Sequence, residues 1–199
     1  QQQDGQKSNS FCGCLSLAFY KPYFDVDTED IIERLRTVAI PERELEKNTF
    51  MSLMGERPDM YGPFWICTTL VFSMAVASNL SNWWEFKGQT NMWTYDFSKI
   101  VSAASLIFGY QALMPVAVWF ALRYMGVQVA VVQTLTLYGY AILAFVPATA
   151  LCTITSSLWL LQWLVMLAAT AHSLWFIYAN MWPWLSEQLG VKAFPVMAT

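Results

Sequence analysis

The sequence changes character at residue 60, where a charge-rich segment gives way to a long uncharged one. Of the 11 basic and 14 acidic residues, 18 lie within residues 1–59, and the run from Met60 to Trp84 contains none. About 20 apolar residues are enough for a helix to cross the ~30 Å hydrocarbon core of a bilayer, and this run is longer than that. The sequence therefore predicts two parts, a water-exposed segment of residues 1–59 and a membrane body of residues 60–199.

Asp59 is the last charged residue before this run, and it is placed to cap the first membrane helix. The first N–H groups of a helix have no partner within the helix, and a carboxylate can accept from them and complement the helix dipole. Pro63 fits the first turn, and Tyr61 and Trp65 suit the level of the lipid headgroups. We expect Asp59, Tyr61, Gly62 and Pro63 to position the N-terminal segment against the membrane helices.

Further uncharged stretches predict further spans. The stretch 124–186 would form a helix of about 95 Å, three times the hydrocarbon thickness, so it must fold back, and residues 152–157 are the best place for the break. An apolar run that starts at Ala193 predicts the beginning of a fifth span. The predicted fold is all-α, a polytopic membrane helix bundle of which the sequence contains four of five transmembrane helices. The four spans are predicted at residues 63–84, 100–122, 127–151 and 158–181.

The N-terminal segment is predicted to carry two short amphipathic helices, at residues 28–40 and 42–54. Arg34 and Arg36 lie toward the C-terminal end of the first, where positive charge complements the helix dipole. Its apolar stripe consists of Ile31, Ile32, Leu35, Val38 and Ala39.

The basic residues that flank the spans are unevenly divided between the two sides of the membrane. Because cytosolic loops carry an excess of lysine and arginine, the richer side is expected to be cytosolic, which places the N-terminal segment in the cytosol. The richer side has Arg43, Lys47, Arg57, Arg123 and Lys192, and the other side has Lys87 and Lys99.

Composition and motifs argue against several functions. The formal net charge is -3 and there is no basic cluster, which argues against a nucleic-acid partner. The sequence has no nucleophile set, phosphate-binding loop or metal-ligand cluster, so we expect no enzyme activity, cofactor or metal. Cys12 and Cys14 are separated by one glycine; they are interpreted as unmodified thiols, with a lipidation site or half of a metal site as alternatives.

Polar and small residues within the spans favour ordinary helix packing. His172 is expected to be a neutral imidazole bonded to a neighbouring helix; the alternative is a channel or small-molecule carrier with a polar path near His172, Gln133, Thr134 and Thr136. Pairs of small residues at a spacing of four predict seams between helices. They are Ser105 with Gly109, Ala144 with Ala148, and Ala169 with Ser173.

Two prolines and one glycine within the spans predict local departures from straight, evenly spaced helices. Pro115 and Pro147 are expected to bend the second and third spans. Gly139, between Tyr138 and Tyr140, predicts a tight helix contact, either internal packing or a notch for a partner.

Three stretches of this chain resemble the Yip domain family, Ypt/Rab-interacting membrane proteins of the early secretory pathway. One is Asp59-Met60-Tyr61-Gly62-Pro63, close to the family's usual Asp-Leu-Tyr-Gly-Pro, with Met60 in place of leucine. The others are residues 23–28 and Tyr138-Gly139-Tyr140 with the following Pro147. Residues 23–28, together with residues 78–82, are similar to the Golgi subgroup of that family.

The resemblance implies five spans, a cytosolic N-terminal segment and residence in Golgi or ER–Golgi vesicle membranes. It also implies binding of prenylated Rab-type small GTPases and hetero-oligomers with other Yip-family proteins, in support of vesicle-mediated transport and Golgi organisation. A channel or carrier, or a structural subunit of a larger membrane complex, are the alternatives. The residues expected to serve as signature or partner-docking positions are Asp59, Tyr61, Gly62, Pro63, Tyr138, Gly139, Tyr140 and Pro147.

Overall fold

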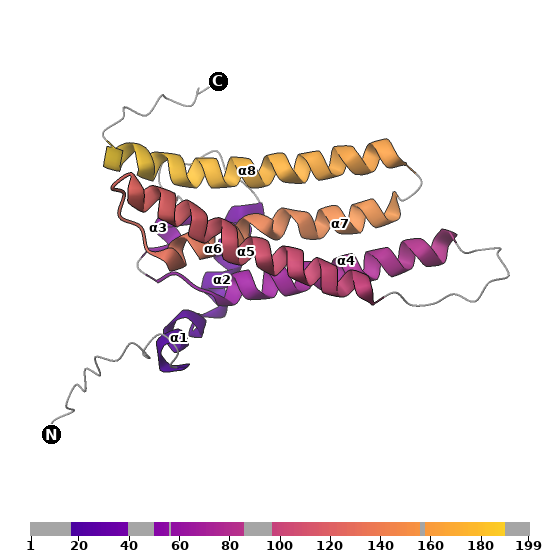
Figure 1. The fold of residues 1–199 in the computed structure, drawn as a ribbon, viewed down its shortest axis with the longest axis horizontal. Helices are drawn as coiled ribbons and strands as arrows, with labels where there is room; N and C mark the ends of the chain where they lie inside the picture. Colours follow the sequence, from indigo (N-terminus) through magenta and orange to yellow (C-terminus); the bar gives the residue numbers. More distant parts are fainter. Residues whose placement is uncertain (1–16, 40–49, 56, 86–96, 156–157, 190–199) are drawn as a thin grey trace.

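The computed structural model describes residues 17–39, 50–55, 57–85, 97–155 and 158–189, and every regular element within these ranges is a helix (Figure 1). The predicted all-α class is confirmed. The elements are α1 (Leu17–Phe24), α2 (Thr28–Ala39), α3 (Phe50–Met54), α4 (Tyr61–Glu85), α5 (Ser98–Tyr124), α6 (Val131–Ala141), the 3₁₀ helix η2 (Ile142–Ala144), α7 (Phe145–Ile154) and α8 (Trp159–Leu189).

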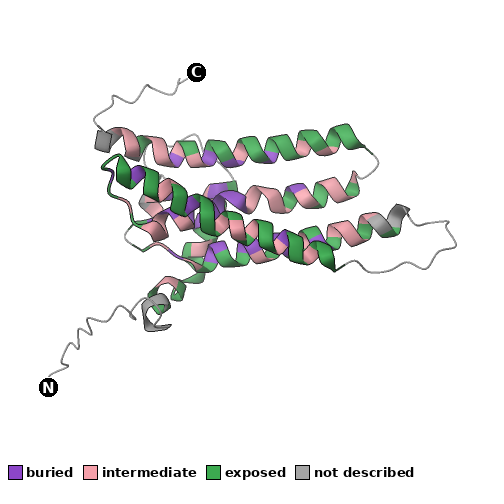
Figure 2. Ribbon diagram, viewed as in Figure 1, coloured by how far each residue is buried: buried purple, intermediate pink, exposed green. Residues whose placement is uncertain are grey.

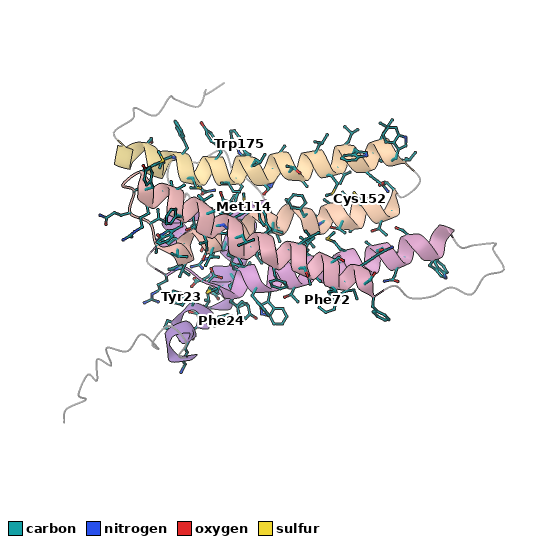
Figure 3. The ribbon with its side chains drawn as sticks, viewed as in Figure 1. Tyr23, Phe24, Phe72, Met114, Cys152 and Trp175 are labelled. Carbon is teal, nitrogen blue, oxygen red and sulfur yellow. The ribbon has the colours of Figure 1, made fainter. Side chains whose placement is uncertain are left out.

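Within these described ranges, four helical segments are long and apolar enough to cross a membrane: Tyr61–Ser81, Ser98–Tyr124, Val131–Ile154 and Trp159–Pro183. Exposed residues follow the outer sides of α5 and α8 over most of their length, while buried residues gather around α6 and the facing part of α4 (Figure 2). Phe72 on α4 and Trp175 on α8 are among the large apolar side chains on the outer surface (Figure 3). An apolar surface of this extent needs lipid rather than water around it, so the chain is a multi-span membrane protein.

The third span is not one continuous α-helix. It consists of α6, η2 and α7, and it begins at Val131, four residues after the predicted start. Pro147 lies in the first turn of α7 and has no N–H to donate to the carbonyl of Leu143, which lies in η2. The predicted bend thus takes the form of a 3₁₀ segment, whereas Pro115 is buried within α5, which continues from Ser98 to Tyr124.

The helices pack around α4 and α6. Helix α4 contacts α5, α6 and α7, while α8 packs against α7, α6 and η2. Helices α2 and α3 contact one another and the same end of the bundle, at α6 and η2. The core is therefore concentrated at this end, where it combines residues of α2, α3, α4, α6, η2 and α8. Its members are Val38, Phe50, Met54, Ile66, Cys67, Leu70, Leu137, Tyr140, Ala141, Ile142 and Phe176.

Two of the predicted small-residue pairs differ in outcome. Ala169 and Ser173 are buried within the bundle, as a seam requires. At Gly109 an added Cβ would meet no atom within 4 Å, and Ser105 is exposed. The seam predicted at Ser105 and Gly109 is therefore not formed with any described helix of this chain.

Some predictions fall outside the described residues. These are the state of Cys12 and Cys14, the fifth span beginning at Ala193, and residues 42–49 of the second amphipathic helix. The remainder of that helix is present as α3.

Candidate functional site

Asp59 is completely buried, with 0% of its surface exposed. Its carboxylate forms an ion pair with the guanidinium of Arg34 on α2. It also accepts hydrogen bonds from the N–H of Gly62 in α4, at 2.9 Å, and from the hydroxyl of Tyr140 in α6, at 3.2 Å. The predicted capping of the first membrane helix is confirmed. This group of four residues, here called the Asp59 junction, connects three helices through one carboxylate.

Arg34 holds the chain that leads into the membrane as well as the carboxylate. Only 5% of the residue is exposed, and a second guanidinium nitrogen donates to the carbonyl oxygen of Arg57 at 3.1 Å. From the other side, the hydroxyl of Thr136 in α6 donates to the carbonyl oxygen of Asp59 at 2.7 Å. The backbone at residues 57–59 is therefore fixed between α2 and α6.

The burial of this ion pair makes the two charges dependent on one another. Removing one partner of a buried pair leaves the other charge without compensation, which typically costs ~3–5 kcal/mol. Arg34 pairs with one oxygen of Asp59, and Gly62 and Tyr140 donate to the other, so each carboxylate oxygen has a partner. Helix α2 is thus fixed to the first turn of α4 rather than loosely tethered to it.

Two glycines allow α4 and α6 to approach closely at the junction. A Cβ at Gly62 would overlap the hydroxyl of Tyr140, and a Cβ at Gly139 would overlap the ring of Pro63. Gly139 therefore accommodates the proline of the neighbouring helix, which matches the internal-packing interpretation of this glycine.

Helix α3 is inserted into the same end of the bundle. The N–H of Phe50 donates to the side-chain oxygen of Asn180 in α8 at 2.8 Å, and the amide nitrogen of Asn180 donates to the carbonyl of Phe176 at 2.7 Å. The ring of Phe50 lies 5.1 Å from that of Tyr140 and 5.2 Å from that of Phe176, between centroids. The start of α3 therefore joins α8 to the residue that donates to Asp59.

Comparison with known proteins identifies the family. The family model described as the Yip1 domain matches residues 40–198, most of the chain. The chain belongs to the Yip1 domain family. It is 34% identical to a protein called YIPF1 homolog from Dictyostelium discoideum over 98% of this chain, and 30% identical to the protein YIP5 of Schizosaccharomyces pombe over 65% of this chain. These alignments cover 54% and 50% of the two relatives, so the chain spans about half their length. No solved structure matches it.

The structure brings five of the eight predicted Yip-domain positions together: Asp59, Gly62, Pro63, Gly139 and Tyr140. The other three lie apart from the carboxylate. Tyr61 is 40% exposed and packs on Trp65, Tyr138 packs on Tyr110 of α5, and Pro147 is exposed in the first turn of α7.

Sequence reasoning missed the role of Arg34, which it assigned to the helix dipole. A signal was present, because Arg34 lies three residues after Ile31 and four before Val38, on the apolar face of α2. Asn180 was also missed, although it is an amide within a membrane-spanning helix, where a polar side chain needs a partner.

The residues of the carrier alternative do not gather into a shared polar site in the described chain. The hydroxyl of Thr134 donates to carbonyls of its own helical turn, and that of Thr136 to Asp59 and Val132. Nδ1 of His172 is buried and has no hydrogen-bond partner among the described residues, so it does not form the predicted bond to a neighbouring helix. The described residues contain no group of three or more potential metal ligands.

Proposed function

We propose that this Yip1 domain protein is a scaffold of Golgi and ER–Golgi vesicle membranes that binds Rab-type small GTPases and other Yip-family proteins. In this role its N-terminal segment faces the cytosol, and binding rather than catalysis supports vesicle-mediated transport. The observation that carries the proposal is the Asp59 junction, because it fixes α2 at the membrane surface instead of leaving it on a flexible tether.

The face that α2 presents is acidic. Glu29, Asp30 and Glu33 are exposed, and Asp25 and Asp27 are exposed immediately before the helix. The buried residues of the helix, Arg34 and Val38, are directed into the bundle. A fixed surface with this charge is complementary to a partner with a basic patch and increases the rate of encounter.

A hollow of about 300 Å³ lies between α2 and α3 beside this acidic face. Asp30, Glu33 and Arg57 contribute charged groups to its lining, and Leu53 and Met54 contribute apolar ones. A partner's side chain could therefore combine an apolar contact with an ionic one at this place.

The test is co-purification of prenylated Rab-type GTPases with the intact protein from detergent-solubilised membranes. Charge reversal of Glu29→Lys, Asp30→Lys and Glu33→Lys together should lower recovery about tenfold, because it replaces attraction by repulsion without altering a buried residue. Lys99→Glu, an exposed charge change in the first turn of α5, is the control and should leave recovery unchanged. Equal recovery with the reversed and the original α2 would reject the proposal.

A further inference from the structure

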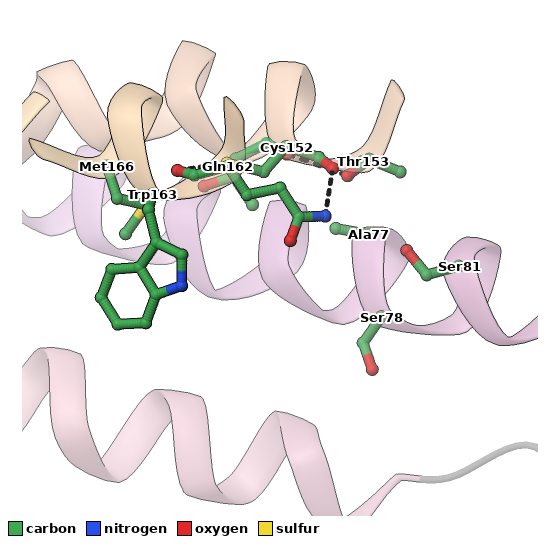
Figure 4. Close-up of a pocket in the computed structure, with 9 residues that line it drawn as sticks. Ala77, Ser78, Ser81, Cys152, Thr153, Gln162, Trp163 and Met166 are labelled. Atoms are coloured by element: carbon green, nitrogen blue, oxygen red, sulfur yellow. Dashed lines mark hydrogen bonds between the residues drawn. The ribbon is translucent and has the colours of Figure 1, made fainter. Parts of the chain in front are cut away.

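Two hollows run into one another, from the end of α4 that lies away from the Asp59 junction to the core residues Leu70 and Ile142. The outer hollow, about 510 Å³, lies between α4, α7 and α8 (Figure 4). The inner hollow, about 480 Å³, lies between α4, α5, α7 and α8. Thr149, Cys152 and Met166 line both. The two hollows form one groove, here called the α5–α8 groove, which is polar at one end and apolar at the other.

The polar end of the α5–α8 groove carries hydroxyl and amide groups. Ser78 and Ser81 line it, and within the part of the chain that the structure describes neither hydroxyl has a hydrogen-bond partner. Thr68 and Ser73, on the same helix, instead donate to carbonyls one turn back. Ser78 and Ser81 are therefore free to bond a ligand, and a hydroxyl without a partner in an apolar environment is unfavourable.

Two side chains of α8 complete the polar end. The amide nitrogen of Gln162 donates to the carbonyl of Cys152 at 3.3 Å (Figure 4). The ring of Trp163 is 65% exposed and lies on the α5 side of the α7–α8 pair. An indole near the end of a membrane helix is typical of the headgroup level of a bilayer.

The other end of the α5–α8 groove is apolar; it reaches the buried Leu70 and is open at Leu106, which is 74% exposed. Leu70 and Met74 of α4, Leu106 of α5, Phe145 of α7 and Ile177 of α8 line it. From Ser81 to Leu70 the groove follows 11 residues of α4, about 16 Å at ~1.5 Å per residue. That length equals about half of the ~30 Å hydrocarbon core, the depth of one leaflet.

Among the residues that the structure describes, no aspartate, glutamate, lysine or arginine lines either hollow. A charged headgroup would lose its hydration at the polar end without gaining an opposite charge, whereas a neutral hydroxyl headgroup finds hydrogen-bonding groups there. We infer that the α5–α8 groove binds one uncharged membrane lipid with a hydroxyl headgroup, of the diacylglycerol class. The headgroup lies at Ser78 and Ser81, and an acyl chain extends to Leu70. This site is separate from α2 and does not rest on the proposed GTPase binding.

The experiment uses the full chain in phosphatidylcholine vesicles that contain a trace of diacylglycerol with a photoactivatable acyl chain. We expect cross-linking to residues 106–110 of α5 and 166–174 of α8 to exceed that at Leu160 and Leu164, on exposed positions outside the groove. Thr170→Trp, which fills the groove, should lower this labelling at least about fivefold, because the chain is excluded by volume. Ala171→Trp, on a neighbouring exposed position that does not line the groove, should leave it unchanged.

Two further measurements secure the interpretation. Leu106→Trp blocks the groove from the opposite wall and should have the same effect as Thr170→Trp, which guards against a folding defect in one variant. Ser78→Ala together with Ser81→Ala should lower labelling by diacylglycerol about tenfold while labelling by a photoactivatable phosphatidylserine stays at its low level. Equal labelling of the Thr170→Trp and Ala171→Trp proteins, or equal labelling by the two lipids, would show contact with surrounding bilayer lipid only and overturn the inference.

Discussion

The two ends of the helix bundle satisfy their polar groups in different ways. At the Asp59 junction a charge is completely buried, and its partners are side chains and N–H groups of the same chain. At the polar end of the α5–α8 groove the described side chains are uncharged, and two of their hydroxyls have no partner among the described residues. A closed site of the first kind stabilises the fold, while an open site of the second kind is available to a ligand.

The helices also pack more closely at the Asp59 junction than around the α5–α8 groove. Glycines at positions 62 and 139 bring α4 and α6 into contact at the junction, and α3 is inserted beside them. Farther along, α5 packs on α4 and α6 while α8 packs on α7, α6 and η2, and the groove lies between α5 and α8. Substitutions should therefore be costly at the first end and tolerated at the second.

The largest effect is expected from Asp59→Ala. It leaves the guanidinium of Arg34 buried without a counter-charge and removes the acceptor of Gly62 and Tyr140, so it should destabilise the protein by ~3–5 kcal/mol. Thermal unfolding in detergent, followed by tryptophan fluorescence, measures the change. Asp30→Ala, an exposed carboxylate on α2, is the control and should change stability by less than ~0.5 kcal/mol. Similar melting of the two variants would mean that the junction does not hold α2 in place.

A smaller effect is expected from Gly139→Ala. The new methyl group would overlap Pro63, and overpacking of this kind costs ~1–3 kcal/mol. Gly109→Ala provides a matched control within another membrane helix, because its methyl group would meet no atom within 4 Å. Alanine is favoured over glycine in a helix by ~0.5–1 kcal/mol, so this variant should be as stable as the original or more so. A higher melting temperature for Gly139→Ala than for Gly109→Ala would contradict the predicted overlap with Pro63.

The sequence predicted well what depends on local pattern. The uncharged run between Lys99 and Arg123 placed the second span within two residues of α5 at each end, because charge is excluded from the hydrocarbon core. Asp59 was identified as the cap of the first span because its carboxylate and the N–H group that donates to it are only three residues apart in the sequence.

What the sequence did not predict depends on contacts between distant segments. Arg34 and Asp59 are 25 residues apart, and Phe50 and Asn180 are 130 apart, so neither pair follows from periodicity. The sequence predicted a bend at Pro147, but not that the missing N–H would be accommodated by a 3₁₀ segment. The α5–α8 groove is a space that these helices leave unfilled, and its existence depends on their crossing rather than on any motif.

The smallest effect on stability is expected from Ser78→Ala combined with Ser81→Ala, the same pair that should weaken labelling by diacylglycerol. Because these hydroxyls have no partner within the described chain, their loss should change the free energy of unfolding by less than ~0.5 kcal/mol. Thr136→Val is the matched removal of one hydroxyl at the other end. It deprives the Asp59 carbonyl of a 2.7 Å hydrogen bond and should cost ~1 kcal/mol or more.

Both variants are compared by their melting temperatures in the same detergent without added lipid. If the serine variant is the less stable of the two, its hydroxyls support the fold, and the contrast between a closed and an open end is wrong. Suppose that the serine variant has the same melting temperature as the original protein, and that added diacylglycerol stabilises only the original protein. The two serines then contribute to ligand binding and not to the stability of the fold. That result follows from linkage, because a ligand stabilises a folded protein only to the extent that it binds.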